Sequence, residues 1–506
     1  MQDLLVLTLS LMLLLVAMVV RRHGHASSKA VYTRLATSLK STFAGWLRQP
    51  AIVIRDRATA HRLLVRGCVG GSFSNRPASM APSSVLSHRR YHNLTSAPYG
   101  PFWRVARRNL TSEVLHPVRL HRYAAARRDA LCGLVADLRE QCTSKPDGLV
   151  LSAESIRTAM FGLLTTMCFG EGVDAGLTRA MADAQHDLVQ FFPELRVFAK
   201  LPAVARLIHR QRWSKLVALR RKQEEMYLPL IHARRSRQRK SGETPAYVDT
   251  LIDLRVPDDH NKRRRPRRLT DGELVGMCSE FLGAGTETVA AALQWIMANL
   301  VKRPHMQEAV RREINAAVDA DAEEVGEEVL GKLEYLNAVL MEVLRLYPTA
   351  TLVFRQVSEK DDIIHDGQRI LTGTNVLFAL KSLAQDKATW ADPDEFKPER
   401  FLADKGGENV NLVAAAGSGG EIRMIPFGAG RRVCPGMGIA MLHMGYFTAN
   451  LVREFEWREA EGELAVNLRP HFGFFTVMKH PLRAHLAVLP RREGISKGGV
   501  NSRKEE

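Results

Sequence analysis

The stretch PFGAGRRVCPGMG, from Pro426 to Gly438, decides the fold of this chain. It holds four glycines, two prolines, two arginines and one cysteine. Glycine and proline at this density build a tight, rigid turn. The cations before Cys434 and a helix that starts after Gly436 both stabilise a thiolate. The sulfur is therefore a candidate nucleophile, redox switch or metal ligand; the alternative is a buried cysteine in a tight loop.

Five residues of this turn occur at a spacing that is specific to one family of proteins. Phe427, Gly430, Arg432, Cys434 and Gly436 resemble the haem-ligand loop of the cytochrome P450 superfamily at every fixed position. The chain resembles a haem-thiolate monooxygenase of the plant microsomal (A-type) class. The resemblance implies that Cys434 is the axial iron ligand of haem b, with Gly436 exposing backbone donors to the sulfur. It also implies that Arg432 contacts a haem propionate and that Phe427 shields the thiolate.

The resemblance implies a mainly α fold with small peripheral β-sheets, in a catalytic domain that spans residues 51–490. Apolar periodicity predicts helices at Thr178–Phe192, Trp213–Arg235 (with a kink at Pro229), Leu333–Leu346 and Gly436–Phe455. Apolar runs predict strands at Ala51–Ile54 and within FFTVMK (474–479) and HLAVLP (485–490).

One predicted helix is unusually long. It starts at a capping box, Thr270 with Glu273, and continues to Val301, a length of about 50 Å. Its middle reads FLGAGTET (281–288), where two glycines each cost about 1 kcal/mol relative to alanine. Either a ligand approaches the helix there or another helix packs closely.

The segment AGTET (284–288) resembles the oxygen-activation motif of the family. The resemblance implies that Glu287 relays protons and that Thr288 holds the water that donates them. It also implies that Ala284 contacts the haem and that Gly285 leaves room for oxygen. The alternative for Thr288 is a hydroxyl that bonds back to its own helix.

Two further patterns concern buried charge. Trp103 and Arg107 lie four residues apart, on one helix face, and Arg355 follows later in the chain; by resemblance all three contact a propionate. Taken alone, the first pair predicts only a packed indole beside a solvated arginine.

A second pattern consists of Glu342 and Arg345 in EVLR, with Arg400 in FKPERF. By resemblance, these three residues would form a structural triad that supports folding and haem retention.

The N-terminus reads as a membrane anchor. The apolar run Leu4–Val20 is followed by RRHGH, which predicts an uncleaved single-pass helix within residues 1–22 and a catalytic domain on the cytosolic face of the endoplasmic reticulum. Residues 23–50 form a short linker that lacks the family's proline-rich hinge, and residues 491–506 form a polar tail. The six cysteines show no paired spacing, as expected of reduced thiols.

The net charge is +18, which favours an acidic partner or membrane face. No nucleic-acid-binding signature accompanies it. The resemblance implies NADPH as electron source through a separate cytochrome P450 reductase, for which Arg431 and Arg432 would offer a basic face. The expected substrate is an apolar small molecule; specialised metabolites, fatty acyl chains and tetrapyrrole-like pigments are all compatible. By resemblance the substrate pocket is lined by Leu188–Phe192, Phe281, Leu282, Leu352, Val353 and Phe475.

Two alternatives remain open at this point. One is a P450 that rearranges peroxides without oxygen or reductase, and the pair Glu287–Thr288 argues against it. The other is a non-functional membrane haem protein, which the missing hinge favours.

Overall fold

The computed structural model describes residues 51–66, 71–77, 83–86, 93–144, 148–198, 202–238, 242–258, 265–358, 363–365, 368–403, 410, 412 and 422–490. The predicted anchor (1–22), linker (23–50) and tail (491–506) lie outside these residues. Within the described part of the chain, no helix combines the length and apolar composition needed to cross a bilayer.

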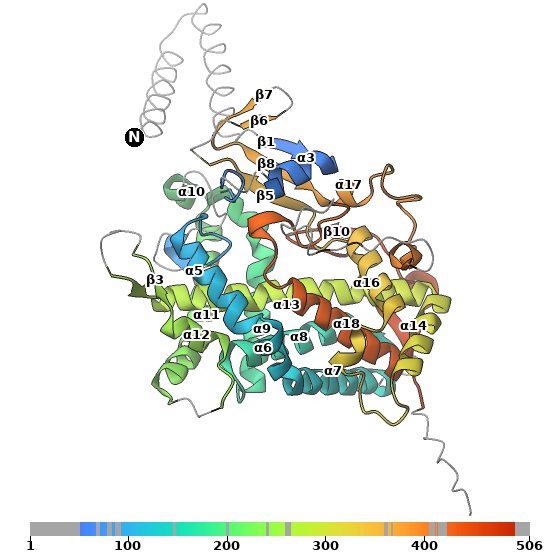
Figure 1. Ribbon diagram of the computed structural model, residues 1–506. Coiled ribbons are helices and arrows are strands. Elements are labelled where there is room, and N and C mark those ends of the chain that lie inside the picture. Colours follow the sequence, from blue (N-terminus) through green and yellow to red (C-terminus); the bar gives the residue numbers. More distant parts are fainter. Residues whose placement is uncertain are drawn as a thin grey trace, which may run out of the picture.

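Helices dominate the described residues, as predicted, and small sheets lie at the periphery (Figure 1). The α-helices are α3 (Arg57–His61), α4 (Ser83–Leu86), α5 (Pro101–Asn109), α6 (Pro117–Leu120), α7 (Ala124–Ser144), α8 (Ser152–Phe169), α9 (Ala175–Phe191), α10 (Pro202–Ile208), α11 (Arg210–Ser236), α12 (Tyr247–Asp253), α13 (Asp271–Lys302), α14 (Pro304–Ala317), α15 (Glu327–Leu330), α16 (Glu334–Leu346), α17 (Leu380–Ala384) and α18 (Met437–Glu454).

The long helix α13 runs across the middle of the molecule (Figure 1). Its 32 residues begin at the predicted capping box: the Thr270 hydroxyl accepts from the Glu273 N–H, and the Glu273 carboxylate accepts from the Thr270 N–H. The second half of α13 is almost wholly buried, and Trp295 there is fully shielded from solvent. Because α8, α9, α16 and α18 all pack against α13, this helix is the axis of the main core.

The sheets are short and peripheral. In one three-stranded sheet, β1 (Ala51–Ile54) pairs in parallel with β8 (Asn375–Ala379), which pairs antiparallel with β5 (Leu352–Gln356). A second sheet has the order β2 (Leu149–Leu151), β12 (Arg483–Val488), β9 (Phe455–Glu459). The remaining strands form two-stranded pairs: β3 (Arg255–Val256) with β4 (Arg267–Arg268), β6 (Ile363–His365) with β7 (Gln368–Ile370), and β10 (Pro470–Phe472) with β11 (Thr476–Met478).

The predicted elements are present with small shifts of their ends. The strand at Ala51–Ile54 and the helix after Gly436 lie where the apolar pattern put them. The helix predicted from Trp213 starts earlier, at Arg210, and Pro229 lies inside it without ending it. Only Thr476–Met478 of the predicted FFTVMK strand pairs with a neighbour, because the chain turns before it at Gly473.

Candidate functional site

The turn around Cys434 has the tight geometry that its composition predicts. Gly428 and Gly430 adopt φ values of +73° and +70°, a left-handed region that a side chain would strain. The Cys434 N–H donates to the Phe427 carbonyl at 2.9 Å, which closes the loop, and α18 begins three residues after the cysteine. The two glycines are therefore required by the backbone path that presents the sulfur.

Cys434 is exposed although protein surrounds it. Burial raises the pKa of its thiol, and the Gly436 backbone N–H, Arg107 and Arg76 oppose that rise. The thiolate therefore requires a further cation, such as a metal ion, to be the stable form at neutral pH.

Four arginines gather around this cysteine. Arg107 donates to the Val433 carbonyl at 2.8 Å, and it and Arg76 both act electrostatically on Cys434. Burial, aided by the positive charges of Arg76 and Arg355, lowers the pKa of Arg432 to about 9. Guanidinium groups keep their proton at neutral pH, so these arginines place positive charge beside the cysteine loop.

Sequence analysis did not identify Arg76, which lies in SNRPAS (74–79). Burial lowers the pKa of Arg76, while Glu280 of α13 and Cys434 act to raise it. A single arginine before a proline carries no signal of its own. Only the fold, which brings residue 76 next to residues 280 and 434, gives it a place in the site.

Arg432 is buried, and backbone carbonyls bind its guanidinium. It donates to the carbonyls of Ser74 (2.8 Å), Leu94 (3.0 Å) and Ala97 (2.6 Å). Arg432 therefore fixes segments 74 and 94–97 to the cysteine loop. The expected basic face for a reductase includes Arg431, which is exposed, but not Arg432, which is 5% exposed and has no outer surface to offer.

The structure brings Trp103, Arg107 and Arg432 together. The guanidinium carbons of Arg432 and Arg107 lie 4.5 and 6.0 Å from the Trp103 ring centroid. Trp103 is buried, and cations at this distance above an indole are attracted by the ring. The WxxxR pattern on α5 is thus part of the site rather than an indole beside a solvated arginine.

Arg355, on β5, is nearly fully buried and reaches the same region. Its guanidinium donates to the Phe354 carbonyl at 2.8 Å and to the Ala429 carbonyl in the cysteine loop at 3.2 Å. Its charge also contributes to the low pKa of Arg432. The fold therefore places Arg355 with the other arginines despite its distance along the chain.

One side of the middle of α13 faces the site around Cys434. Glu280, Ala284 and Thr288 follow one another at spacings of four residues, on one side of the helix. Glu280 accepts from the N–H groups of Leu94 and Thr95, both at 2.8 Å. Burial raises the pKa of Glu280, and those hydrogen bonds oppose the rise. Ala284 is exposed within an otherwise buried helix, so this side of α13 borders the site.

The two glycines in the middle of α13, Gly283 and Gly285, serve close packing. A Cβ at Gly285 would lie 2.7 Å from Leu164 Cδ1 on α8, and one at Gly283 would meet the Gln185 side chain on α9. The expectation that Gly285 leaves room for oxygen is therefore wrong in direction, because its missing side chain faces α8. The expected alternative, close helix packing, accounts for both positions.

Thr288 and Glu287 also have partners that the sequence did not determine. The Thr288 hydroxyl donates to the Ala284 carbonyl at 2.7 Å, which is the back-bonding alternative. Glu287 Oε1 lies 3.0 Å from His186 Nδ1 on α9. Adjacent residues of a helix point in different directions, so the acid and the alcohol lie on neighbouring faces here.

The predicted triad is confirmed. Arg345 donates to both carboxylate oxygens of Glu342, at 2.7 and 2.8 Å, and neither side chain is exposed. Arg400 lies 3.4 Å from Glu342 Oε1. Arg345 also donates to the carbonyls of Ala384 and Pro393. These bonds satisfy a buried charge and tie α16 to the segment before the cysteine loop.

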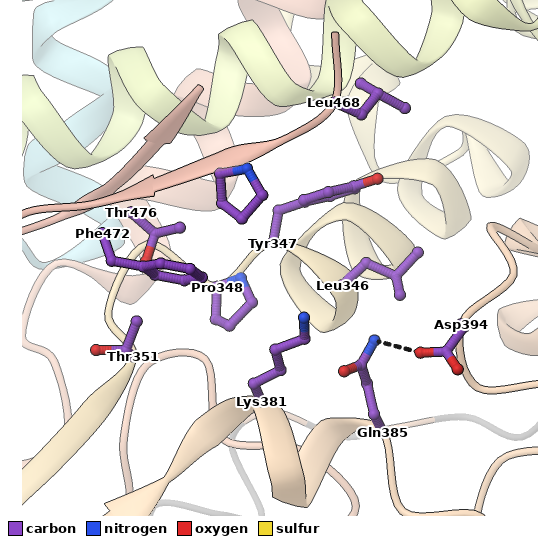
Figure 2. A pocket seen from close by; sticks show the side chains of 11 residues that line it. Leu346, Tyr347, Pro348, Thr351, Lys381, Gln385, Asp394, Leu468, Phe472 and Thr476 are labelled. Carbon is purple, nitrogen blue, oxygen red and sulfur yellow. Dashed lines mark hydrogen bonds between the residues drawn. The ribbon is translucent and has the colours of Figure 1, made fainter. Parts of the chain in front are cut away.

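A cavity of about 220 Å³ lies elsewhere, at the C-terminal end of α16 (Figure 2). Tyr347, Pro348 and Phe472 line it together with the Lys381 amine, which points into it. None of the residues described above for the site around Cys434 or for the triad borders it, and neither does any residue of the expected substrate pocket. It is separate from the site around Cys434.

The residues present fit a haem group. A dianionic porphyrin with two propionates would balance the cluster of arginines, and iron would supply the cation that the Cys434 thiolate requires. Cys434 in the loop and Ala284 on α13 are both exposed, so both offer accessible surface to such a ligand.

Comparisons with known proteins agree with this site. The family model for cytochrome P450 matches residues 9–486. Cytochrome P450 89A9 of Arabidopsis thaliana is 37% identical over 450 residues, which cover 88% of this chain and 85% of the relative. Cytochrome P450 78A9 of the same species is 30% identical, over 83% and 75% of the two chains. Flavonoid 3'-monooxygenase of Petunia hybrida is 28% identical, over 82% and 79%. The chain is therefore a plant-type enzyme of the cytochrome P450 family.

Proposed function

We propose that this enzyme is a haem-thiolate monooxygenase that inserts one atom of O2 into an apolar small molecule. Its electrons come from NADPH through a separate NADPH–cytochrome P450 reductase. Haem b supplies the iron centre at which O2 is activated. The residues assigned to the haem are Cys434 as the iron ligand and Trp103, Arg107, Ala284, Arg355, Phe427, Arg432 and Gly436 as contacts.

The observation that carries the proposal is the cluster of arginines beside the Cys434 sulfur. Burial lowers the pKa of Arg76, Arg107 and Arg432, and the Glu280 carboxylate opposes that shift in all three. Arg76 and Arg107 each favour the charged form of Cys434. The positive charge favours the binding of an anionic ligand, and the thiolate favours a ligand that contains a metal ion.

Glu287 and Thr288 are assigned to proton supply and Arg432 to the support of the site. Glu287 can accept and release a proton, and Thr288 can turn its hydroxyl from the Ala284 carbonyl to a water molecule. Arg432 holds segments 74 and 94–97 against the cysteine loop, which fixes the path of the loop that presents the sulfur.

We also assign the enzyme to the endoplasmic reticulum membrane, with residues 1–22 as the anchor and the catalytic domain in the cytosol. The apolar run Leu4–Val20, followed by two arginines, supports this placement. The apolar side chains near α13 support an apolar substrate, but they do not select one compound.

The test is the carbon-monoxide difference spectrum of the reduced full-length protein in microsomes, followed by turnover with reductase. We expect the red-shifted Soret band of thiolate-ligated haem, its loss in Cys434→Ala, and NADPH consumption that depends on the reductase. Hydroperoxide rearrangement without NADPH would favour the peroxide-rearranging alternative. A wild-type protein without the thiolate band would favour the non-functional alternative.

A further inference from the structure

A histidine–carboxylate pair joins α9 to the part of α13 that holds the predicted proton-relay residue. His186 Nδ1 lies 3.0 Å from Glu287 Oε1. Ser279, Gly283 and Glu287 are spaced by four on α13 and all meet α9: Ser279 donates to Gln185 at 2.9 Å, and Gly283 lies against the same glutamine. The contact is therefore a regular helix–helix interface that ends in an ionisable pair.

The pair runs from the solvent toward the interior. The His186 side chain is 37% exposed, whereas that of Glu287 is 13% exposed. Among the described residues, His186 Nε2 has no hydrogen-bond partner in the protein, so water reaches it. Imidazole accepts a proton at one nitrogen and donates another from the second, which lets it connect solvent to a more buried acid.

The charges around the pair come from three helices. On α9, Asp187 favours the protonated form of His186; on α8, Arg157 disfavours it; on α13, Glu287 favours it. Glu154 and Asp183 bind the guanidinium of Arg157, which limits its effect on the pair. The hydrogen bond with Glu287 dominates and raises the pKa of His186 above its ordinary value.

We propose that His186 is a positioning residue that holds Glu287 and supplies it with protons from solvent. The proposal rests on the proposed function. In each cycle Nε2 takes a proton from solvent and Nδ1 gives one to Glu287 Oε1, which returns the imidazole to its starting charge with the proton on Nε2. Proton exchange with solvent or a flip of the ring then restores the form that carries a proton on Nδ1. Glu287 then releases one proton inward, toward the water assigned to Thr288. Reduction of O2 to water consumes four protons and reduction to H2O2 consumes two, so a slower supply favours H2O2.

The first experiment uses the full-length enzyme with reductase in lipid vesicles and no added substrate. The ratios of NADPH, O2 and H2O2 measure how much O2 is reduced to water. His186→Gln keeps a hydrogen bond to Glu287 and His186→Arg keeps a positive charge, but neither transfers a proton at neutral pH. We expect both to raise the fraction of O2 released as H2O2 several-fold, with an unchanged thiolate band.

The matched control is His232→Gln. His232 pairs with Asp271 at 3.1 Å, between α11 and the start of the same helix α13. This variant makes the same substitution in a histidine–carboxylate pair far from Glu287, and we expect wild-type ratios from it. In the wild type, water formation should fall as the pH rises through the pKa of His186, and this step should be absent from both His186 variants.

A second readout does not depend on turnover. Histidine labelled at Cε1 allows the titration of His186 to be followed by NMR. We expect Glu287→Gln to lower its pKa and Asp271→Asn to leave it unchanged. Wild-type H2O2 fractions and pH profiles in both His186 variants would overturn the inference while leaving the proposed function intact. A wild-type enzyme without NADPH-dependent O2 consumption would overturn both.

Discussion

Glu280 and Arg432 hold the same residue from opposite sides. The Leu94 N–H donates to Glu280 Oε2 at 2.8 Å, and the Leu94 carbonyl accepts from Arg432 Nη1 at 3.0 Å. Glu280 belongs to α13 and Arg432 to the cysteine loop, so one backbone segment links the two halves of the site. The Glu280 carboxylate in this link also provides negative charge next to the buried arginines.

The first prediction concerns this link. Glu280→Gln removes a negative charge near Arg76 and turns an NH2 group toward one of the two backbone N–H donors at residues 94–95. An unsatisfied buried donor costs about 1–3 kcal/mol. We expect a lower melting temperature and weaker haem retention, measured by thermal scanning and by haem transfer to apomyoglobin. Unchanged values for both would show that the carboxylate does not hold the segment.

The second prediction concerns the packing of Gly285. Gly285→Ala gains about 1 kcal/mol of helix propensity. It also forces a methyl group toward Leu164 Cδ1, and overpacking of this kind costs about 1–3 kcal/mol. We expect net destabilisation in the wild type and stabilisation when Leu164→Ala is also present. Additive effects in this double-mutant cycle would mean that the two residues do not contact each other.

The third prediction concerns the buried triad. Glu342→Gln leaves Arg345 buried without its counter-charge, which costs about 3–5 kcal/mol. The matched control is Glu225→Gln, which breaks the exposed pair with Arg221, where the side chains are 66% and 80% exposed. We expect the thiolate band to be lost in Glu342→Gln and kept in Glu225→Gln. Equal yields of folded haem protein would contradict a structural role for the triad.

The fourth prediction concerns acid stability. His443 on α18 is buried, and burial lowers its pKa to about 3. The unfolded chain binds this proton below about pH 6.5, whereas the folded protein does so only near pH 3. Its contribution to stability is therefore complete above pH 6.5 and is lost as the pH falls, by about 1.4 kcal/mol per unit.

His443→Leu removes that titration, so the melting temperature of the variant should fall less than that of the wild type between pH 6.5 and pH 4. Differential scanning calorimetry at several pH values compares the two. If the melting temperatures of the two proteins fall equally with pH, His443 is protonated in the folded protein over this pH range.

Sequence analysis could predict local features well because they depend on neighbours along the chain. The capping box at Thr270 and Glu273, the tight turn before Cys434 and the pair Glu342–Arg345 each lie within a few residues of one another. Hydrogen bonds and helical spacing then fix their geometry. The resemblance added what such spacing cannot, since it joined Arg400 to the pair Glu342–Arg345, and Trp103 and Arg355 to the site around Cys434.

The sequence by itself determined the cysteine loop, the long helix and the faces on which their side chains lie. Only the tertiary structure decided which partner each face meets. Gly285 turns toward α8, Glu287 toward His186, and Arg76 toward the sulfur. The physical reason is that helical periodicity sets the angle between residues on one helix. The packing of distant segments, driven by burial of their apolar surfaces, sets what stands opposite.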